Sequence, residues 1–159
     1  MIGTREQIIE RIETLLSNVT GITAVYRDRG EMPIDKLPAA ILLDGSENLA
    51  YPVTPNKSGR MPPAIFILSP QIFVVLQPRD DMTNSTLNGI AAPIGPELSG
   101  YRDKILADVV NDPTLLGLLT ANGQIVYRGC DTDMQTGSSM VGQLQMHFEF
   151  HYVLNPSQV

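Results

Sequence analysis

The segment from Val141 to Leu154 alternates between apolar and polar side chains, and this pattern constrains the fold more than any other. The apolar set is Leu144, Met146, Phe148, Phe150, Tyr152 and Leu154, and the polar set is Gln143, Gln145, His147, Glu149 and His151. A period of two predicts a β-strand with one face in the core and the other in solvent. Such a strand would be roughly 45 Å long at about 3.3 Å per residue, whereas a chain of this size forms a globule only about 30 Å across. We therefore expect part of the strand to extend beyond the body of the protein, towards a neighbour.

The clearest helix is predicted over residues 4–19, where apolar residues recur at helical spacing. Thr4 and Gln7 have the spacing of a capping box, and Gly21 is a plausible stop. The apolar stripe contains Ile8, Ile12, Leu15, Leu16 and Val19. We expect Phe148 and Phe150 of the closing strand to be buried against this stripe.

The other predicted elements form a group of strands, then two helices, then a further strand before the closing one. Strands are predicted over residues 22–28, 38–44, 64–77 and 124–130, and helices over residues 97–111 and 113–119. Asp112-Pro113 has the form of an N-cap followed by a proline at the first helical position. Because strands are grouped and helices are segregated, we expect an α+β fold with a mainly antiparallel sheet and helices packed on one face. The whole chain, residues 1–159, is expected to form a single domain.

Two long irregular stretches interrupt this pattern, over residues 45–63 and 78–96. Both are rich in proline and glycine, and neither shows a helical or strand period. Irregular stretches of this length are uncommon inside a compact domain and are often functional. Within the strand predicted over residues 64–77, Pro70 indicates a bulge, a bend or a sheet edge, because proline donates no ladder hydrogen bond.

Composition excludes several classes of function. The net charge is −6 and basic residues are not clustered, which argues against electrostatic binding of nucleic acid. Cys130 is the only cysteine, so neither an internal disulfide nor a cysteine-based zinc site is possible within the chain. The apolar runs are too short to span a bilayer, and the N-terminus lacks the apolar core of a signal peptide. We expect a soluble protein that is made and used in a cytoplasm.

One group of residues could carry chemistry. His147, Glu149 and His151 share a face of the closing strand and are types that ligate zinc, so a small metal-binding enzyme is one interpretation. The same residues equally fit the solvent face of an amphipathic strand. Cys130 could act as a nucleophile beside one of these histidines, or be a small buried apolar residue. The common nucleotide, hydrolase and metalloprotease motifs are absent from the sequence. We therefore expect no enzyme, no catalytic residue, no metal and no cofactor, and a function in assembly.

The order of elements resembles the tail terminator proteins of long-tailed bacteriophages, the family of the lambda minor tail protein U. The resemblance extends over most of the chain and has no single diagnostic motif. It is carried by residues 37–41 (LPAAI) with 45–47 (GSE), 69–75 (SPQIFVV), 97–102 (ELSGYR), 112–115 (DPTL), 122–129 (NGQIVYRG) and 150–156 (FHYVLNP).

The resemblance implies a homohexameric ring on the last ring of tail-tube protein. Such a ring stops tube polymerisation and offers its other face to the head-tail connector, in a virion assembled in the host cytoplasm. Genomic DNA would only pass through the lumen, and neither a membrane nor a cofactor is implied. A neck or head-completion protein is the alternative. We expect subunit or partner contacts at Tyr51, Arg60, Arg79, Asp131 and Asp133.

Overall fold

A computed structural model of the chain describes residues 3–28, 34–55, 57–76, 86–87, 90–91, 94–120, 123–135 and 141–154. Its main element is a five-stranded sheet, in the order β1 (Ala24–Arg27), β2 (Ala39–Leu49), β3 (Ala64–Val75), β7 (Val141–Leu154) and β6 (Gln124–Gln135). The helices are α1 (Thr4–Ser17), α2 (Ile94–Val110), α3 (Pro113–Leu118) and the short 3-10 helix η1 (Ile34–Lys36). A separate two-stranded ribbon contains β4 (Thr86–Leu87) and β5 (Ile90–Ala91).

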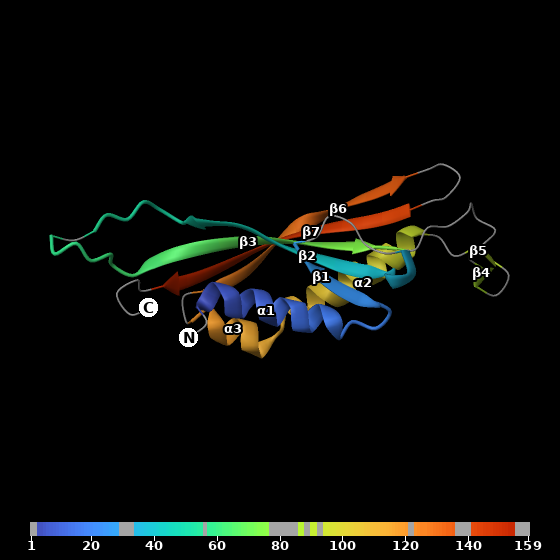
Figure 1. Cartoon of the computed structure of the whole chain (residues 1–159), viewed down its shortest axis with the longest axis horizontal. Coiled ribbons are helices and arrows are strands. Elements are labelled where there is room, and N and C mark those ends of the chain that lie inside the picture. Colours follow the sequence, from blue (N-terminus) through green and yellow to red (C-terminus); the bar gives the residue numbers. More distant parts are fainter. Residues whose placement is uncertain are drawn as a thin grey trace.

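The three α-helices lie on one side of the five-stranded sheet (Figure 1). Every pairing within that sheet is antiparallel except β1 with β2, which is parallel. The predicted α+β class is therefore confirmed, with helices on one face of a mainly antiparallel sheet. A short parallel strand at one edge is the departure from a purely antiparallel sheet.

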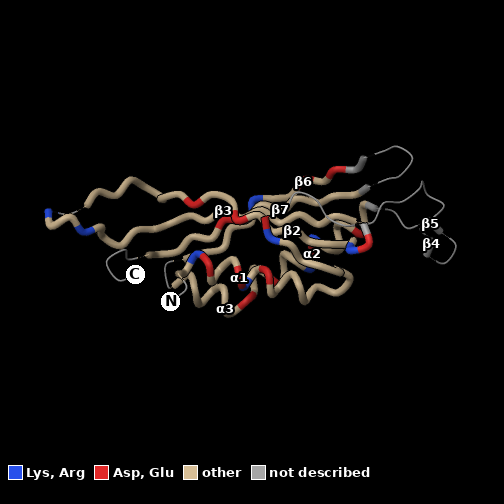
Figure 2. Tube along the Cα trace, in the orientation of Figure 1, with Lys and Arg blue, Asp and Glu red and all other residues tan. Residues whose placement is uncertain are grey.

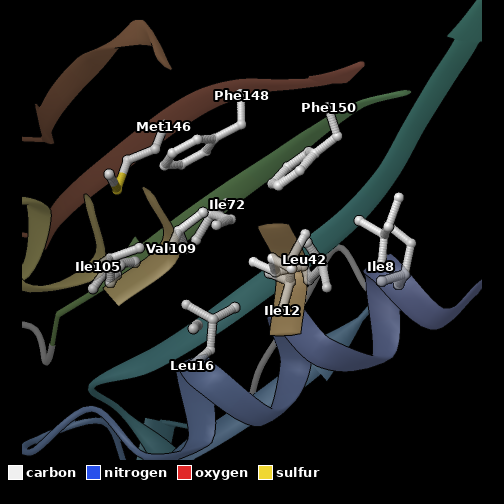
Figure 3. Packing of buried hydrophobic residues seen from close by; sticks show 14 of the residues in the cluster. Ile8, Ile12, Leu16, Leu42, Ile72, Ile105, Val109, Met146, Phe148 and Phe150 are labelled. Carbon is white, nitrogen blue, oxygen red and sulfur yellow. The ribbon is translucent and has the colours of Figure 1, made fainter. Parts of the chain in front are cut away.

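The core lies between the sheet and the helices (Figure 3). Alternate residues of β7 are buried on this side, as predicted, and Phe148 and Phe150 are 1% and 0% exposed. Their rings point into the helix layer, where side chains of both α1 and α2 face them (Figure 3). The buried stripe of α1 is Ile8, Ile9, Ile12 and Leu16. The predicted stripe is therefore wrong at Leu15, which lies at the margin of the core and is only partly buried.

Long-range ion pairs fasten the helix layer. Arg11 of α1 donates two hydrogen bonds, of 2.9 and 2.7 Å, to the carboxylate of Asp112. The same carboxylate accepts the Leu115 N–H at 2.9 Å, which confirms the predicted N-cap of α3. Because the hydrogen bonds from Arg11 favour the ionised carboxylate of Asp112, the pKa of Asp112 is lowered from its ordinary value. Arg27 of β1 similarly joins Asp44 of β2 to the surface of α1.

Helix α1 begins at residue 4, as predicted, but the prediction is wrong about its N-terminal capping and about its end. The capping box does not form, because Gly3 occupies the N-cap position and makes no side-chain cap, so Thr4 is already helical. Helix α1 ends at Ser17 with Asn18 as its C-cap, and the positive φ of Gly21 (98°) belongs to the turn that follows. Further along, α2 begins at Ile94 and not at residue 97. The last three residues of the stretch predicted to be irregular, 94–96, are therefore helical.

The stretch over residues 45–63 is the largest correction to the predicted elements. Strand β2 does not stop at Asp44 but continues to Leu49, and it pairs with β3 before and after residues 44–45. A bulge between Leu43 and Ser46 lies opposite Pro70, and Gly45 in it adopts a φ of 71°. Even-numbered residues of β2 face the helices before the bulge and odd-numbered residues do so after it. The alternation of side chains is therefore interrupted in the sequence, although the strand continues.

The connection between β2 and β3, residues 50–63, projects past the helices at one end of the molecule (Figure 1). We call this segment the arm. At its base, Tyr152 of β7 donates a hydrogen bond to Glu47 of β2. Burial, together with this bond, raises the pKa of Tyr152. The arm therefore starts from a firmly paired part of the sheet.

Candidate functional site: the open face of the sheet and the arm

The side of the sheet that faces away from the helices is the open face. Its members alternate with the buried residues of each strand, so β7 contributes Gln143, Gln145, His147, Glu149, His151 and Val153. In β3 the corresponding residues are largely apolar: Ile65, Ile67, Gln71, Phe73 and Val75. None of these apolar residues belongs to the helix-side core cluster. The strand β3 is thus apolar on both faces, although helices cover only one.

The apolar part of the open face forms two patches. One lies near the base of the arm, where Ile65 pairs with Val153 and Ile67 pairs with His151. The other lies at the opposite end, where Phe73 is partly exposed between Gln145 and Ile41, although Ile41 itself is only 7% exposed. Burying such surface against another molecule is favourable, at about 25 cal/mol per Å² of apolar area.

Polar residues occupy the middle of the open face. Glu149 of β7 pairs with Arg128, which sits at a bulge of β6, and accepts a second contact from His151 at 3.2 Å. The pairing with Arg128 lowers the pKa of Glu149. His147 instead contacts Asp131 of β6, with 3.2 Å between Nε2 and Oδ2. The two histidines therefore approach different carboxylates.

This geometry bears on the metal interpretation of His147, Glu149 and His151. Across the part of the chain that the structure describes, no three His, Cys, Asp or Glu side chains are grouped so that they could hold an ion. Each histidine has one carboxylate partner, and Arg128 already neutralises Glu149. The arrangement is that of separate side-chain pairs on the open face, each joining two or three residues of β6 and β7.

Cys130 lies on β6 and pairs with Met146 of β7, so it faces the helices. His147 and His151 are on the neighbouring strand, as expected, but on the opposite face. The thiol and the imidazoles therefore point to different sides of the sheet. Nearby, burial and then a hydrogen bond with Cys130 raise the pKa of Tyr127 to about 12.

The structure places four of the five residues predicted to make contacts. Tyr51 and Arg60 lie in the arm, where Tyr51 is 54% exposed. Asp131 and Asp133 lie on β6 near its C-terminal end and are exposed. The strand predicted over residues 124–130 continues to Gln135, so both aspartates are in the sheet and not beyond its end. Arg79 lies outside the described residues.

Sequence reasoning missed the apolar residues of the open face. The segment AIFILSPQIFVV, residues 64–75, contained a signal for them, because nearly every position on both sides of the strand is apolar. A strand of this kind needs cover on both faces. Here helices supply one cover, and the second cover is not part of the described chain.

No protein-family model matches this chain, and no curated protein matches it significantly. Among the described helices, none is long and apolar enough to cross a membrane.

Proposed function

We propose that the protein is a structural tail terminator of a long-tailed bacteriophage. In this proposal, six copies form a ring that caps the tail tube, stops its polymerisation and provides the attachment surface for the head-tail connector. The protein would act in the virion after assembly in the host cytoplasm, as a structural subunit and not as an enzyme. DNA would pass through the lumen without sequence-specific binding.

The observation that carries the proposal is the combination of a partly apolar sheet face that no described helix covers with an arm that projects from the body (Figure 1). Ile65, Ile67, Phe73 and Val75 of this face are partly buried and lie outside the helix-side core, and Tyr51 of the arm is 54% exposed. Exposed apolar surface of this kind is typical of proteins that assemble. A subunit that presents two unlike surfaces can form the repeated contacts of a ring.

The ring is tested by native mass spectrometry of the purified protein together with electron microscopy of particles. Disruption of the gene in its phage should give over-long tails without heads. Tails of normal length beside heads that lose DNA would instead identify a neck or head-completion protein. Particles indistinguishable from wild type would refute both.

The arm allows a second test at the level of one segment. Replacing residues 51–62 with a short Asn-Gly turn should leave the folded subunit almost as stable, because loop length affects stability only weakly. The same variant should fail to complement a disrupted gene. Circular dichroism melting and plaque counts measure the two outcomes, and full complementation would remove the arm from the assembly surface.

A further inference from the structure

The arm has a distinct chemical character. It contains Lys57 and Arg60 and no acidic residue. Lys57 is exposed, and Tyr51 is exposed over 54% of its surface. The rest of the arm is rich in proline and includes Val53 and Met61. It therefore presents a basic and partly apolar surface.

The far end of the open face has the complementary character. Asp131 and Asp133 are exposed there, and 80% of the Asp131 side chain is accessible. Through β7, these two residues share rows of the sheet with Phe73 and Val75, because Asp131 and Phe73 both pair with Gln145, and Asp133 and Val75 both pair with Gln143. We call this region, formed by Phe73, Val75, Asp131 and Asp133, the acidic end. It is acidic and partly apolar.

These two surfaces are too far apart to meet within one chain. The arm leaves the sheet beside Phe66, and the acidic end lies in the rows of Phe73 and Val75. Phe66 and Val75 are nine positions apart in β3, which corresponds to roughly 30 Å at about 3.3 Å per residue. The arm points away from the end at Val75 (Figure 1). In Figure 2 the blue parts of the arm lie towards its tip, and the red part of β6 lies near the end of that strand that is farther from the arm.

We propose that the arm of one copy docks on the acidic end of the open face of a second copy. Lys57 and Arg60 would lie against Asp131 and Asp133, and the apolar residues of the arm would cover Phe73 and its neighbours. Such a contact joins two unlike surfaces, so it is heterologous and can repeat from copy to copy until a ring closes. Complementary charge fixes the partner and the orientation more than the affinity. The contact between two copies does not depend on the proposed function. Only the closure of repeated contacts into a ring rests on that proposal.

The contact can be trapped with cysteines in the full chain. Cys130 is the only native cysteine, so Cys130→Ser gives a background without thiols. In that background, one batch carries Lys57→Cys and a second, isotope-labelled batch carries Asp133→Cys. After the batches are mixed and oxidised, mass spectrometry should find a disulfide between a labelled and an unlabelled chain.

Gln124→Cys is the matched control, because Gln124 is exposed on the same strand and pairs with His151, towards the other end of the open face. Trapping with Asp133→Cys should exceed trapping with Gln124→Cys by about fivefold or more, because a disulfide forms only between cysteines whose Cα atoms come within about 7 Å of each other. Adding Arg60→Glu to the Lys57→Cys chain should suppress trapping. Asp131→Lys in the partner chain should then restore it.

Salt provides a further check that the contact is electrostatic. The yield should fall at about 1 M NaCl, where the screening length is about 3 Å. Equal trapping at both positions, or indifference to charge reversal, would overturn the inference. If the protein forms six-copy rings without trapping at Asp133→Cys, only this inference fails. If trapping is as expected but the gene is dispensable for tail termination, only the proposed function fails.

Discussion

Two phenylalanines on opposite faces of the sheet test whether the open face is truly outside the core. Phe148 of β7 is 1% exposed and lies on the helix side. Its ring centroid is 5.2 Å from that of Tyr127 and 6.2 Å from that of Phe150. Phe73 of β3 lies on the open face and is partly exposed.

Truncation should therefore have very different costs at the two positions. Phe148→Ala leaves a cavity under the helices and should lower the free energy of unfolding by about 3–5 kcal/mol. For a chain of this length, that corresponds to a fall in Tm of roughly 6–20 °C. Phe73→Ala removes a side chain that is only partly buried, so it should cost less than about 1.5 kcal/mol in the isolated subunit.

Urea denaturation of both variants, with wild type alongside, measures the difference directly. Phe73→Ala should also reduce disulfide trapping between Lys57→Cys and Asp133→Cys, because Phe73 lies within the proposed docking surface. An equal loss of stability in the two variants would show that Phe73 belongs to the core of the subunit. An unchanged free energy of unfolding for Phe148→Ala would show that the two faces of β7 are reversed.

Three further perturbations probe the bulge, the buried carboxylate and the histidines. Gly45→Ala should sharply destabilise the β2–β3 pairing, seen as faster amide exchange in both strands, because its Cβ would approach the Ser69 carbonyl oxygen to 1.9 Å at a φ of 71°. The lowered pKa of Asp112 means that its carboxylate stabilises the fold above about pH 4, and this stabilisation is lost as the pH falls through the folded-state value. Asp112→Asn, which keeps an acceptor for the N-cap, should give urea midpoints that decrease less steeply below about pH 4. His147→Ala with His151→Ala should leave assembly and metal content unchanged, and stoichiometric zinc that disappears in the double variant would contradict this.

The residues that the sequence placed correctly are those whose position follows from a local period. The alternation in β7 identified Phe148 and Phe150 as core residues, and Asp112-Pro113 identified the start of α3. Both patterns depend on neighbours within one turn of helix or two residues of strand, so they can be read without knowing which strands pair.

Other features depended on pairings between distant parts of the chain. Only the tertiary structure decided that β2 continues past Gly45, because the bulge that breaks its period is stabilised by pairing with β3. The same holds for the parallel pairing of β1 with β2 and for the ion pair between Arg11 and Asp112, which are 101 positions apart. Hydrophobic periodicity carries no information about which strand lies beside which.

The candidate site divides in the same way. The sequence determined its ingredients: a proline-rich basic segment, a strand that is apolar on both sides, and two aspartates near Cys130. The tertiary structure decided their arrangement, because the described helices all lie on one face and leave the other side of β3 without helical cover (Figure 1). The strand directions place the arm and the acidic end at opposite ends of the sheet. Helices cover whichever face lets them bury their own apolar stripes, and that choice is made by packing among elements that are far apart in sequence.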